Sequence, residues 1–392
     1  MSHTLHKNLS HFYFVYYFFV GVFVPYWALY LQSERFSPVE IGVLMSIFQI
    51  TRIFAPNFWG WLADHTAKRA IWIRLNAVLG VIGFLAVFWT EGFWSMLFVM
   101  GALSLFTSSI MPLSESLTLA HLANTKGHYS RIRMWGSVGF IAASIVLGYL
   151  IDWAGISNLL WAIVVVQITL FLLTFSLTEV NIAPHHTDHF SVWKILRKPA
   201  VIALLFGCAL MVTAHGVLYN FYSIYLADHG YSKGMIGWLW AVGVICEIMV
   251  FMYMPVIMRH FSLKAIMLVS LGLAVIRFVM IGVAVDHLIL LLIAQSLHAA
   301  TFGSFHAATI EVVAKFFNGR HQAKGQAIYN SVTYGLGGAI GGIAGGYALQ
   351  GLGGELTFLL AAAFPLIGFV VIAFGLKLVT THGDTGMFSS RT

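Results

Sequence analysis

The chain has 392 residues, of which 59% are hydrophobic and 9% charged, and its mean hydropathy is +0.86. An average soluble domain is about 45–50% apolar and about 25% charged, so this composition excludes an ordinary soluble protein. The 21 Lys and Arg residues are too widely spread among apolar runs to form a nucleic-acid-binding surface. Two cysteines, Cys208 and Cys246, provide neither a disulfide framework nor a C-x-x-C metal motif.

Apolar runs long enough to cross a membrane follow one another along the chain. A hydrocarbon core about 30 Å thick requires about 20 apolar residues per helix. Charged residues, Gly, Pro and Asn divide the sequence into twelve such runs, near residues 11–32, 39–59, 71–89, 94–120, 133–152, 157–178, 200–227, 235–257, 265–284, 288–314, 326–348 and 355–377. The first run has no small-residue cleavage pattern, so we expect a retained span rather than a signal peptide.

Basic residues gather on one side of this arrangement. With the N-terminus inside, only Arg35 and Lys233 fall on the outer side, and the positive-inside rule then places both termini in the cytoplasm. We therefore expect a multi-pass protein of the bacterial cytoplasmic (inner) membrane. The expected units are an N-terminal six-helix bundle (1–178), a cytoplasmic linker (179–198), a C-terminal six-helix bundle (199–380) and a cytoplasmic tail (381–392).

The second half of the sequence repeats the first. An offset of 195 residues aligns Tyr30 with Tyr225, Ser37 with Ser232 and Gly42 with Gly237, and an offset of 198 aligns Gly139 with Gly337 and Gly148 with Gly346. Two halves that rock about a central site are typical of alternating-access transporters. The predicted fold class is an all-α integral membrane protein with twelve transmembrane helices in two pseudo-symmetric halves.

Charged residues inside the spans are functional candidates, because a charge at the bilayer centre costs about 2.5–3.5 kcal/mol on insertion scales. Five such charges are Arg52, Glu115, Arg133, Glu247 and Arg277, and His298 and His306 add two groups that can titrate near physiological pH. One interpretation is that they form buried ion pairs that hold helices together. The other is that three arginines against two glutamates leave one cation for an anionic substrate to neutralise.

The loop between spans 2 and 3, NFWGWLADHTAKR from Asn57 to Arg69, resembles a motif of the major facilitator superfamily. The matching residues are Gly60, Leu62, Ala63, Asp64, Lys68 and Arg69. The resemblance implies a gating role: Gly60 would permit a close helix approach, and Asp64 would face the N-terminus of a neighbouring helix while the basic residues stay in the cytoplasm.

The segment Glu115–Phe140 resembles spans 4 and 5 of lactose permease, with Glu115 and Arg133 in place of its substrate-binding carboxylate and guanidinium. Arg277 and His298 resemble its coupling arginine and histidine. Its proton-carrying glutamate is replaced by Thr301, which argues against lactose. Over nearly the whole chain, segments such as VPYWALYL, RIRMWGSVGF and SLHAATFGSFHAA look most like the phenylpropionate permease group, and nucleoside proton symporters share the span 5 pattern.

This resemblance implies a proton-coupled symporter that imports a small organic solute, with an aromatic monocarboxylate such as 3-phenylpropionate ahead of a sugar or nucleoside. Arg133 would bind the carboxylate, oriented by Glu115, and Glu247 and His298 would carry the proton, coupled through Arg277. Further expected substrate contacts are Arg52, Asn220, Tyr26, Trp27, Trp135 and Phe140. An exporter of the same fold and a transporter-like sensor are the alternatives.

We expect no enzymatic activity, since no nucleophile and base occur in a recognisable constellation. The expected coupling ion is the proton, without a cofactor or a metal. The expected partners are a small-molecule substrate and the lipid bilayer, with no nucleic acid, and we expect a functional monomer.

Overall fold

The computed structural model describes residues 3–122, 128–180 and 191–376, and all regular secondary structure in these ranges is helical. The first half contains α1 (His3–Ser33), α2 (Pro38–Thr66), α3 (Arg69–Val87), α4 (Gly92–Leu122), α5 (His128–Ala154) and α6 (Asn158–Thr174). A short helix, α7 (Trp193–Leu196), lies in the predicted linker, of which residues 181–190 are outside the described ranges. The predicted tail, 381–392, is also outside them.

The second half begins with α8 (Pro199–Asp228), α9 (Lys233–His260) and α10 (Leu263–Val283). The next span joins α11 (Leu288–Ser296), the π-helix η1 (Ala299–Ser304) and α12 (Phe305–Phe316), and the short η2 (Gly319–His321) follows. The last helical stretch joins α13 (Gln322–Asn330), the π-helix η3 (Ser331–Gly337) and α14 (Gly338–Gly375).

Gly353 divides α14 into two spans, because its φ of 80° interrupts the helix. The described residues contain ten helices long and apolar enough to cross a membrane, and the one that includes α14 holds both of these spans. The shorter apolar helix α6 supplies the remaining one. The twelve predicted spans are thereby confirmed, and the chain is a multi-pass membrane protein.

The sequence repeat is visible in how two corresponding helices begin. Ser37 caps α2 with φ −65° and ψ 157°, and its side chain accepts a hydrogen bond from the Glu40 backbone N–H. Ser232 caps α9 with φ −64° and ψ 155°, and accepts from the Met235 backbone N–H. Because a serine in extended conformation satisfies otherwise unpaired N–H groups, both repeats start their second span in the same way.

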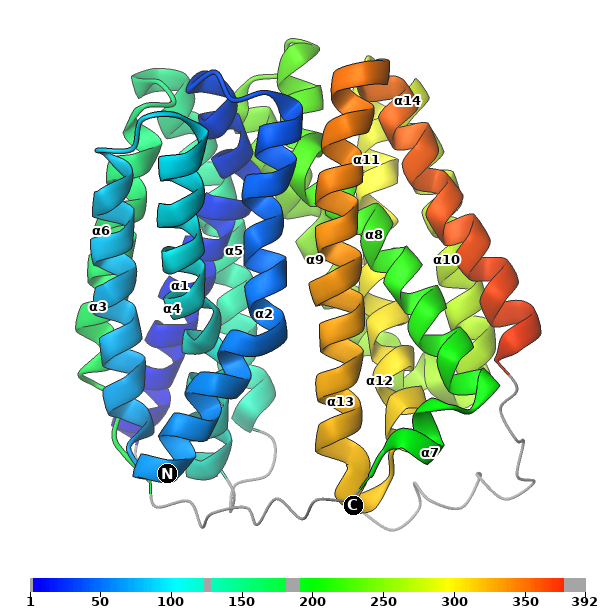
Figure 1. Ribbon diagram of the computed structural model, residues 1–392. Coiled ribbons are helices and arrows are strands. Elements are labelled where there is room, and N and C mark those ends of the chain that lie inside the picture. The colour runs from blue at the N-terminus through cyan, green and yellow to red at the C-terminus, as the bar shows by residue number, and fades with distance from the viewer. Residues whose placement is uncertain (1–2, 123–127, 181–190, 377–392) are drawn as a thin grey trace.

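The helices form two bundles, α1–α6 and α8–α14 (Figure 1). We call the face at which α1 begins and α14 ends the lower face, and the opposite one the upper face. The bundles touch where α2 packs on η3 and α14, where α5 packs on α9, and where α1 packs on α8. In Figure 1, α2 lies beside the first part of α14 near the upper face, and toward the lower face it diverges from α13.

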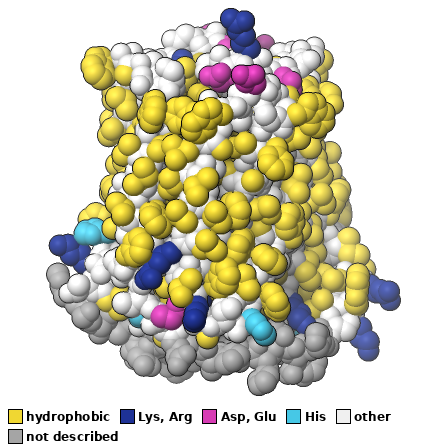
Figure 2. All heavy atoms as spheres, turned by 60° about the vertical axis from the view of Figure 1, so that its left-hand side comes forward, with side chains coloured by type: hydrophobic (Ala, Val, Ile, Leu, Met, Phe, Trp, Pro, Cys, Tyr) yellow, Lys and Arg dark blue, Asp and Glu magenta, His cyan; other side chains and the backbone are white. Residues whose placement is uncertain are grey.

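The outer surface is that of a protein in a bilayer. Figure 2 shows hydrophobic side chains over most of the visible face, with charged groups gathered toward its upper and lower ends. Trp89 and Trp153, next to the upper ends of α3 and α5, are 77% and 85% exposed. Tryptophan is enriched at membrane–water interfaces, so these side chains mark where the upper interface lies.

Candidate functional site

A cavity of about 440 Å³ lies between the two bundles. Its lining comes from α1, α2, α4 and α5 on one side and from α8–α11, η1, η3 and the start of α14 on the other. The aromatic lining residues are Tyr16, Tyr17, Phe19, Phe23, Phe48, Phe140, Tyr219, Trp240, Phe302 and Tyr334. An apolar, aromatic cavity with a few polar groups is the usual form of a small-molecule site.

The charged groups in this lining are predominantly positive. Arg52, Arg133 and Arg277 line the cavity together with one carboxylate, Glu247. Arg52 and Glu247, which align in the sequence repeat, therefore face the same space from opposite bundles. Within the described residues, none of the three guanidinium groups has a carboxylate at ion-pair distance.

Arg133 and Arg52 have neutral neighbours. The guanidinium carbon of Arg133 lies 4.1 Å from the centroid of the Tyr17 ring, a cation–π contact. Arg52 Nη1 donates to Gln49 Oε1 at 3.2 Å. Both side chains are at least partly exposed, so a ligand in the cavity can reach them.

Arg277 is completely buried at the cavity wall. Its Nε donates to the Ala294 carbonyl at 3.0 Å, and its Nη2 donates to Gln295 Oε1 at 3.0 Å. Its Nη1 lies 3.2 Å from Thr301 Oγ1 and 3.4 Å from His215 Nε2. Thr301, at the position that resembles the lactose permease glutamate, thus supplies a hydroxyl, and no carboxylate among the described residues compensates the charge of Arg277.

Glu247 and His298 face each other, with Glu247 Oε2 3.7 Å from His298 Nε2. The imidazole of His298 stacks on Phe302, with ring centroids 5.3 Å apart and planes inclined by 8°. His298 directly precedes the π-helix η1, which contains Phe302, and such a distortion is frequent at functional sites. At this distance the two groups are within ion-pair reach and beyond hydrogen-bond distance, so a proton taken up by either one changes the charge that faces the other.

The structure places the predicted site residues in two groups. Those that line the cavity are Arg52, Arg133, Phe140, Asn220, Glu247, Arg277 and His298. Those outside the described lining are Glu115, Tyr26, Trp27 and Trp135. Glu115 accepts a hydrogen bond from the Tyr129 hydroxyl, so its nearest donor is a phenol and not Arg133.

The three aromatic residues outside the lining have other surroundings. Tyr26 donates to the Ser144 carbonyl on α5, and its hydroxyl also lies 3.1 Å from the Lys233 carbonyl on α9. Trp27 is buried and stacks between Phe23 and Tyr30 within the first bundle. Trp135 is half exposed and packs its edge against Phe14.

Near the upper face the bundles touch through their backbones. A Cβ at Gly237 would overlap the Ser144 carbonyl oxygen, and one at Gly42 would overlap the Gly342 carbonyl oxygen. On the α5–α9 side, the Asp152 carboxylate accepts from the backbone N–H groups of Lys233 and Gly234, both at 2.8 Å. We call these contacts, together with the hydroxyl of Tyr26, the upper seam.

The loop motif at the lower face forms its charge contacts within its own bundle. Asp64 pairs with Arg69, and Lys68 is exposed just before α3. The carboxylate at the N-terminus of α3 is Glu179, which accepts from the backbone N–H groups of Arg69 and Ala70 at 3.0 and 2.8 Å. The expected close approach at Gly60 is contradicted, since a Cβ there would have nothing within 4 Å.

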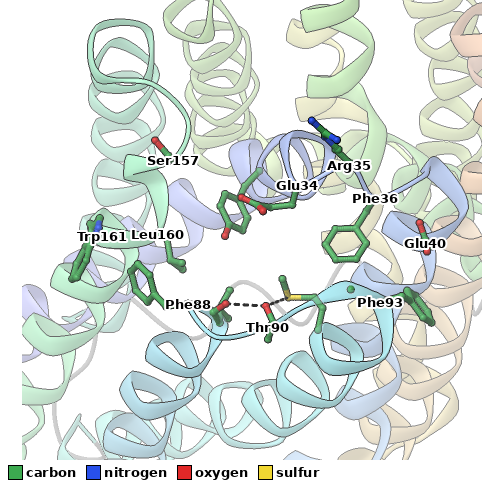
Figure 3. Close-up of a pocket in the computed structure, with 14 residues that line it drawn as sticks. Glu34, Arg35, Phe36, Glu40, Phe88, Thr90, Phe93, Ser157, Leu160 and Trp161 are labelled. Atoms are coloured by element: carbon green, nitrogen blue, oxygen red, sulfur yellow. Dashed lines mark hydrogen bonds between the residues drawn. The ribbon is translucent and has the colours of Figure 1, made fainter.

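A second cavity, of about 500 Å³, lies at the upper face (Figure 3). Its described lining lies between Tyr30 and Trp161 and so belongs to the first bundle alone. Glu34 and Phe36 reach toward it from the loop that follows α1 (Figure 3). A solute that passes between the bundles requires a cavity lined by both, which this one is not.

Comparison with known proteins identifies the family. Residues 6–360 match the model of the MFS_1 like family. The chain belongs to this family. It is 28% identical over 357 residues to the probable 3-phenylpropionic acid transporter of Escherichia coli, which covers 89% of this chain and 92% of that protein. It is 25% identical to the maltose permease of Geobacillus stearothermophilus, with 95% of each chain covered.

A solved structure supports the fold. A crystal structure of a variant of the nucleoside transporter NupG superposes with a TM-score of 0.85 at 17% identity, covering 95% of this chain and 100% of that one. These relatives are named transporters or permeases, so the resemblance predicted from the loop motif is confirmed. The MFS_1 like chain described here is a secondary transporter of the major facilitator type.

Several residues of the cavity and the upper seam escaped sequence reasoning. Tyr17, Tyr219 and Trp240 line the cavity, yet aromatic residues are abundant in every span and give no signal of their own. Asp152 offered a partial signal, because it is an acidic residue at the end of span 5. No motif in the sequence connects it with the N-terminus of α9, which its carboxylate caps.

Proposed function

We propose that this MFS_1 like transporter is a proton-coupled symporter that imports an aromatic monocarboxylate such as 3-phenylpropionate across the bacterial cytoplasmic membrane. The observation that supports this most directly is the charge of the cavity, whose described lining holds three arginines and one glutamate. An uncompensated guanidinium in a low-dielectric site favours an anionic ligand. The similarity to a probable 3-phenylpropionic acid transporter agrees with this substrate class.

The substrate contacts follow from the surroundings of Arg133. Its guanidinium has no carboxylate partner within the described residues, so its N–H groups can donate to a substrate carboxylate. Tyr17, Phe140 and Trp240 offer apolar and stacking surface for an aromatic ring. Asn220, which lines the cavity from α8, adds an amide for hydrogen bonding.

Coupling to protons follows from Glu247, the one carboxylate in the described lining. A proton taken up by Glu247 or His298 makes the cavity more positive and so strengthens its attraction for an anion. By linkage, a bound anion favours uptake of the proton to the same extent. The proton is therefore the proposed coupling ion, without a further cofactor.

The lower face, where the bundles diverge, is the proposed cytoplasmic side, and both termini would lie there. This orientation agrees with the distribution of basic residues in the sequence. The conformation would then be closed to the outside by the upper seam and open to the cytoplasm. Because the cavity is complete within one chain, we propose that the monomer is the functional unit.

The test is uptake by purified protein in liposomes with an imposed pH gradient, in which external alkalinisation is followed as 3-phenylpropionate is added. We expect an alkalinisation signal that Arg133→Ala reduces by at least about tenfold, since a charged hydrogen bond is lost. Arg131→Ala is the matched control, because Arg131 is exposed on the same helix outside the described lining. Empty liposomes measure passive entry of the protonated acid.

Other outcomes of this assay identify the alternatives. A signal with maltose or a nucleoside and none with aromatic acids would retain symport and overturn the proposed substrate, a result that the relatives make worth testing. Solute movement only from the cytoplasmic side outward, in counterflow, would indicate an exporter.

The proposed proton site is tested by Glu247→Gln, which keeps the shape of the side chain and removes its charge. We expect the variant to lose accumulation driven by a pH gradient and to retain exchange of substrate across the membrane. Exchange is measured with labelled substrate on one side and unlabelled substrate on the other. Accumulation at the level of the unmodified protein would place the proton elsewhere.

A further inference from the structure

Arg277 is a buried cation that has no carboxylate partner within the described residues. It is 0% exposed, and its four described hydrogen-bond partners are a carbonyl, an amide, a hydroxyl and an imidazole, all neutral acceptors. The tautomer of His215 is consistent with this, because its Nδ1 is 2.9 Å from the Met211 carbonyl and its Nε2 is left to accept from Arg277. An unpaired buried charge is strongly unfavourable, so the guanidinium is suited to an anion that enters from the cavity.

Gln295 adds donors beside this guanidinium. Its Oε1 accepts from Arg277, which fixes the orientation of the amide, because a reversed amide would set N–H groups against N–H groups. Its Nε2 points away from Arg277 in a side chain that is 2% exposed, and it is buried without a well-formed hydrogen bond, with the likewise unpartnered hydroxyl of Tyr222 as its neighbour. Both residues line the cavity, so the unpaired donor belongs to the same wall as the unpaired charge.

His298 connects this wall with the proton site. Its Nε2 faces Glu247, and its Nδ1 is buried without a partner in a side chain that lines the cavity. With Glu247 ionised, a neutral His298 carries its proton on Nε2, and Nδ1 is an acceptor. One more proton gives either an imidazolium or, once the two groups approach from 3.7 Å to hydrogen-bond distance, a protonated Glu247 that donates to Nε2, and in both cases Nδ1 becomes an N–H donor.

The other titratable or charged groups near His298 do not supply this change. His215, on α8, has its ring centroid 5.9 Å from that of His298, and its two nitrogens already have partners. Arg277, on α10, stays a cation, and so does Arg133, on α5, whose charge acts on Glu247 across the cavity. Glu247, on α9, is the carboxylate already considered. The switch of Nδ1 from acceptor to donor therefore depends on the Glu247–His298 pair.

We infer that Arg277, Gln295 and His298 form a second anion site in the cavity, separate from Arg133, that is completed when the Glu247–His298 pair takes up a proton. The site accepts a carboxylate or a small inorganic anion such as chloride. The inference rests on the proposed function for the identity of the coupling ion, and not for the presence of the site. In this site, proton uptake is coupled to anion binding because His298 Nδ1 changes from a hydrogen-bond acceptor to a donor.

The first test measures the thermal stability of the full-length protein in detergent, at about pH 6 and about pH 8, in sodium chloride and in sodium gluconate, whose anion is bulky. We expect chloride to stabilise the protein more than gluconate does, and more strongly at the lower pH. Gln295→Leu should weaken the apparent affinity for chloride about tenfold, since a hydrogen bond to a charged group is lost. Arg277→Gln should abolish the chloride effect.

Gln167→Leu is the matched control, because Gln167 is a fully buried glutamine of the first bundle with both amide atoms unpartnered and it lies outside the described lining. Its chloride response should equal that of the unmodified protein. Chloride responses that are the same in Gln295→Leu, Gln167→Leu and the unmodified protein would overturn the site. A chloride response that does not depend on pH would overturn its link to the proton.

The second test follows the pH of a weakly buffered protein solution as chloride or 3-phenylpropionate is added. We expect alkalinisation with the anion that occupies the site, lost in Glu247→Gln and in Arg277→Gln. Chloride alone identifies an inorganic occupant, and 3-phenylpropionate alone identifies the substrate carboxylate. A chloride response without transport of any aromatic acid would retain this site and overturn the proposed substrate. Transport of 3-phenylpropionate that Arg133→Ala abolishes, together with a pH response to anions that Arg277→Gln leaves unchanged, would retain the proposed substrate and overturn this site.

Discussion

The upper seam and the cavity below it join the same two bundles by opposite means. In the upper seam, backbone meets backbone at Gly237 and Gly42, and a carboxylate caps the helix of the other bundle. In the cavity, aromatic rings and arginines leave space between the bundles. The comparison indicates that the bundles meet where glycines lack side chains, supported by the side chains of Asp152 and Tyr26, and that large side chains hold them apart at the cavity.

The loop motif at the lower face extends this comparison. Asp64 and Arg69 pair within one loop, and Glu179 caps α3 of the same bundle. The charges that the motif was expected to hold across a gate therefore act inside the first bundle in this conformation. The upper seam consists of contacts between the two bundles, whereas the charged contacts of the loop motif at the lower face lie within the first bundle.

The largest effect is expected from filling the upper seam. In Gly237→Leu the new side chain would collide with the Ser144 carbonyl and the Tyr26 hydroxyl, so the upper face could not close. We expect transport to fall by at least about tenfold, since alternating access requires the closed state, while substrate binding is retained. Transport is measured in liposomes, and binding by calorimetry in detergent.

Gly272→Leu is the control for this substitution, because a Cβ at Gly272 of α10 has nothing within 4 Å. It should transport normally. Normal transport by Gly237→Leu would show that the upper seam tolerates a side chain and would remove the contrast with the cavity.

A smaller effect is expected from the cap on α9. Asp152→Ala removes the acceptor for the Lys233 and Gly234 N–H groups, and loss of a helix cap costs about 0.5–2 kcal/mol. The population open at the upper face should rise by about 2–30-fold. It is measured as labelling of Ser137→Cys, in the cavity lining, by a membrane-impermeant thiol reagent, with Cys208 and Cys246 replaced by serine.

Asp286→Ala provides the comparison, because Asp286 is an exposed aspartate in another loop of the upper face. Its labelling rate should match that of the unmodified protein. Equal labelling in Asp152→Ala and Asp286→Ala would mean that the cap adds nothing to closure.

The fold was predictable because its signals are local. Apolar length determines the spans, and Ser37 and Ser232 mark equivalent helix starts through their own side chains. The merged helix around Gly353 differs only in that a single residue, rather than a loop, separates the last two spans. These features depend on residues that are close together along the chain, so they can be predicted from the sequence alone.

The cavity lining was predictable where a charge lies inside a membrane span, as for Arg133, Glu247 and Arg277, and the roles proposed for these residues stay predictions. It was not predictable where the outcome depends on how a helix is rotated. Glu115 meets the Tyr129 hydroxyl and Tyr26 meets two carbonyls of the upper seam, and neither choice follows from spacing along the chain.

The smallest effect is expected from the hydroxyl of Tyr26. Tyr26→Phe keeps the ring in place and removes the hydroxyl. This hydroxyl donates to the Ser144 carbonyl and also lies near the Lys233 carbonyl. Loss of such a bond costs about 0.5–1.5 kcal/mol, so labelling of the cavity cysteine from the upper side should rise by about 2–12-fold. The change should be smaller than that in Asp152→Ala, where two N–H groups lose their acceptor.

Tyr225→Phe distinguishes closure from general stability. The Tyr225 hydroxyl donates to the Gly282 carbonyl at 2.7 Å, a bond of the same kind inside the second bundle. We expect it to lower the thermal stability about as much as Tyr26→Phe does and to leave the labelling rate unchanged, because both partners move together when the bundles rock. If both variants increased labelling equally, Tyr26 would act through the stability of its helices, and the upper seam would consist of the glycine contacts and Asp152 alone.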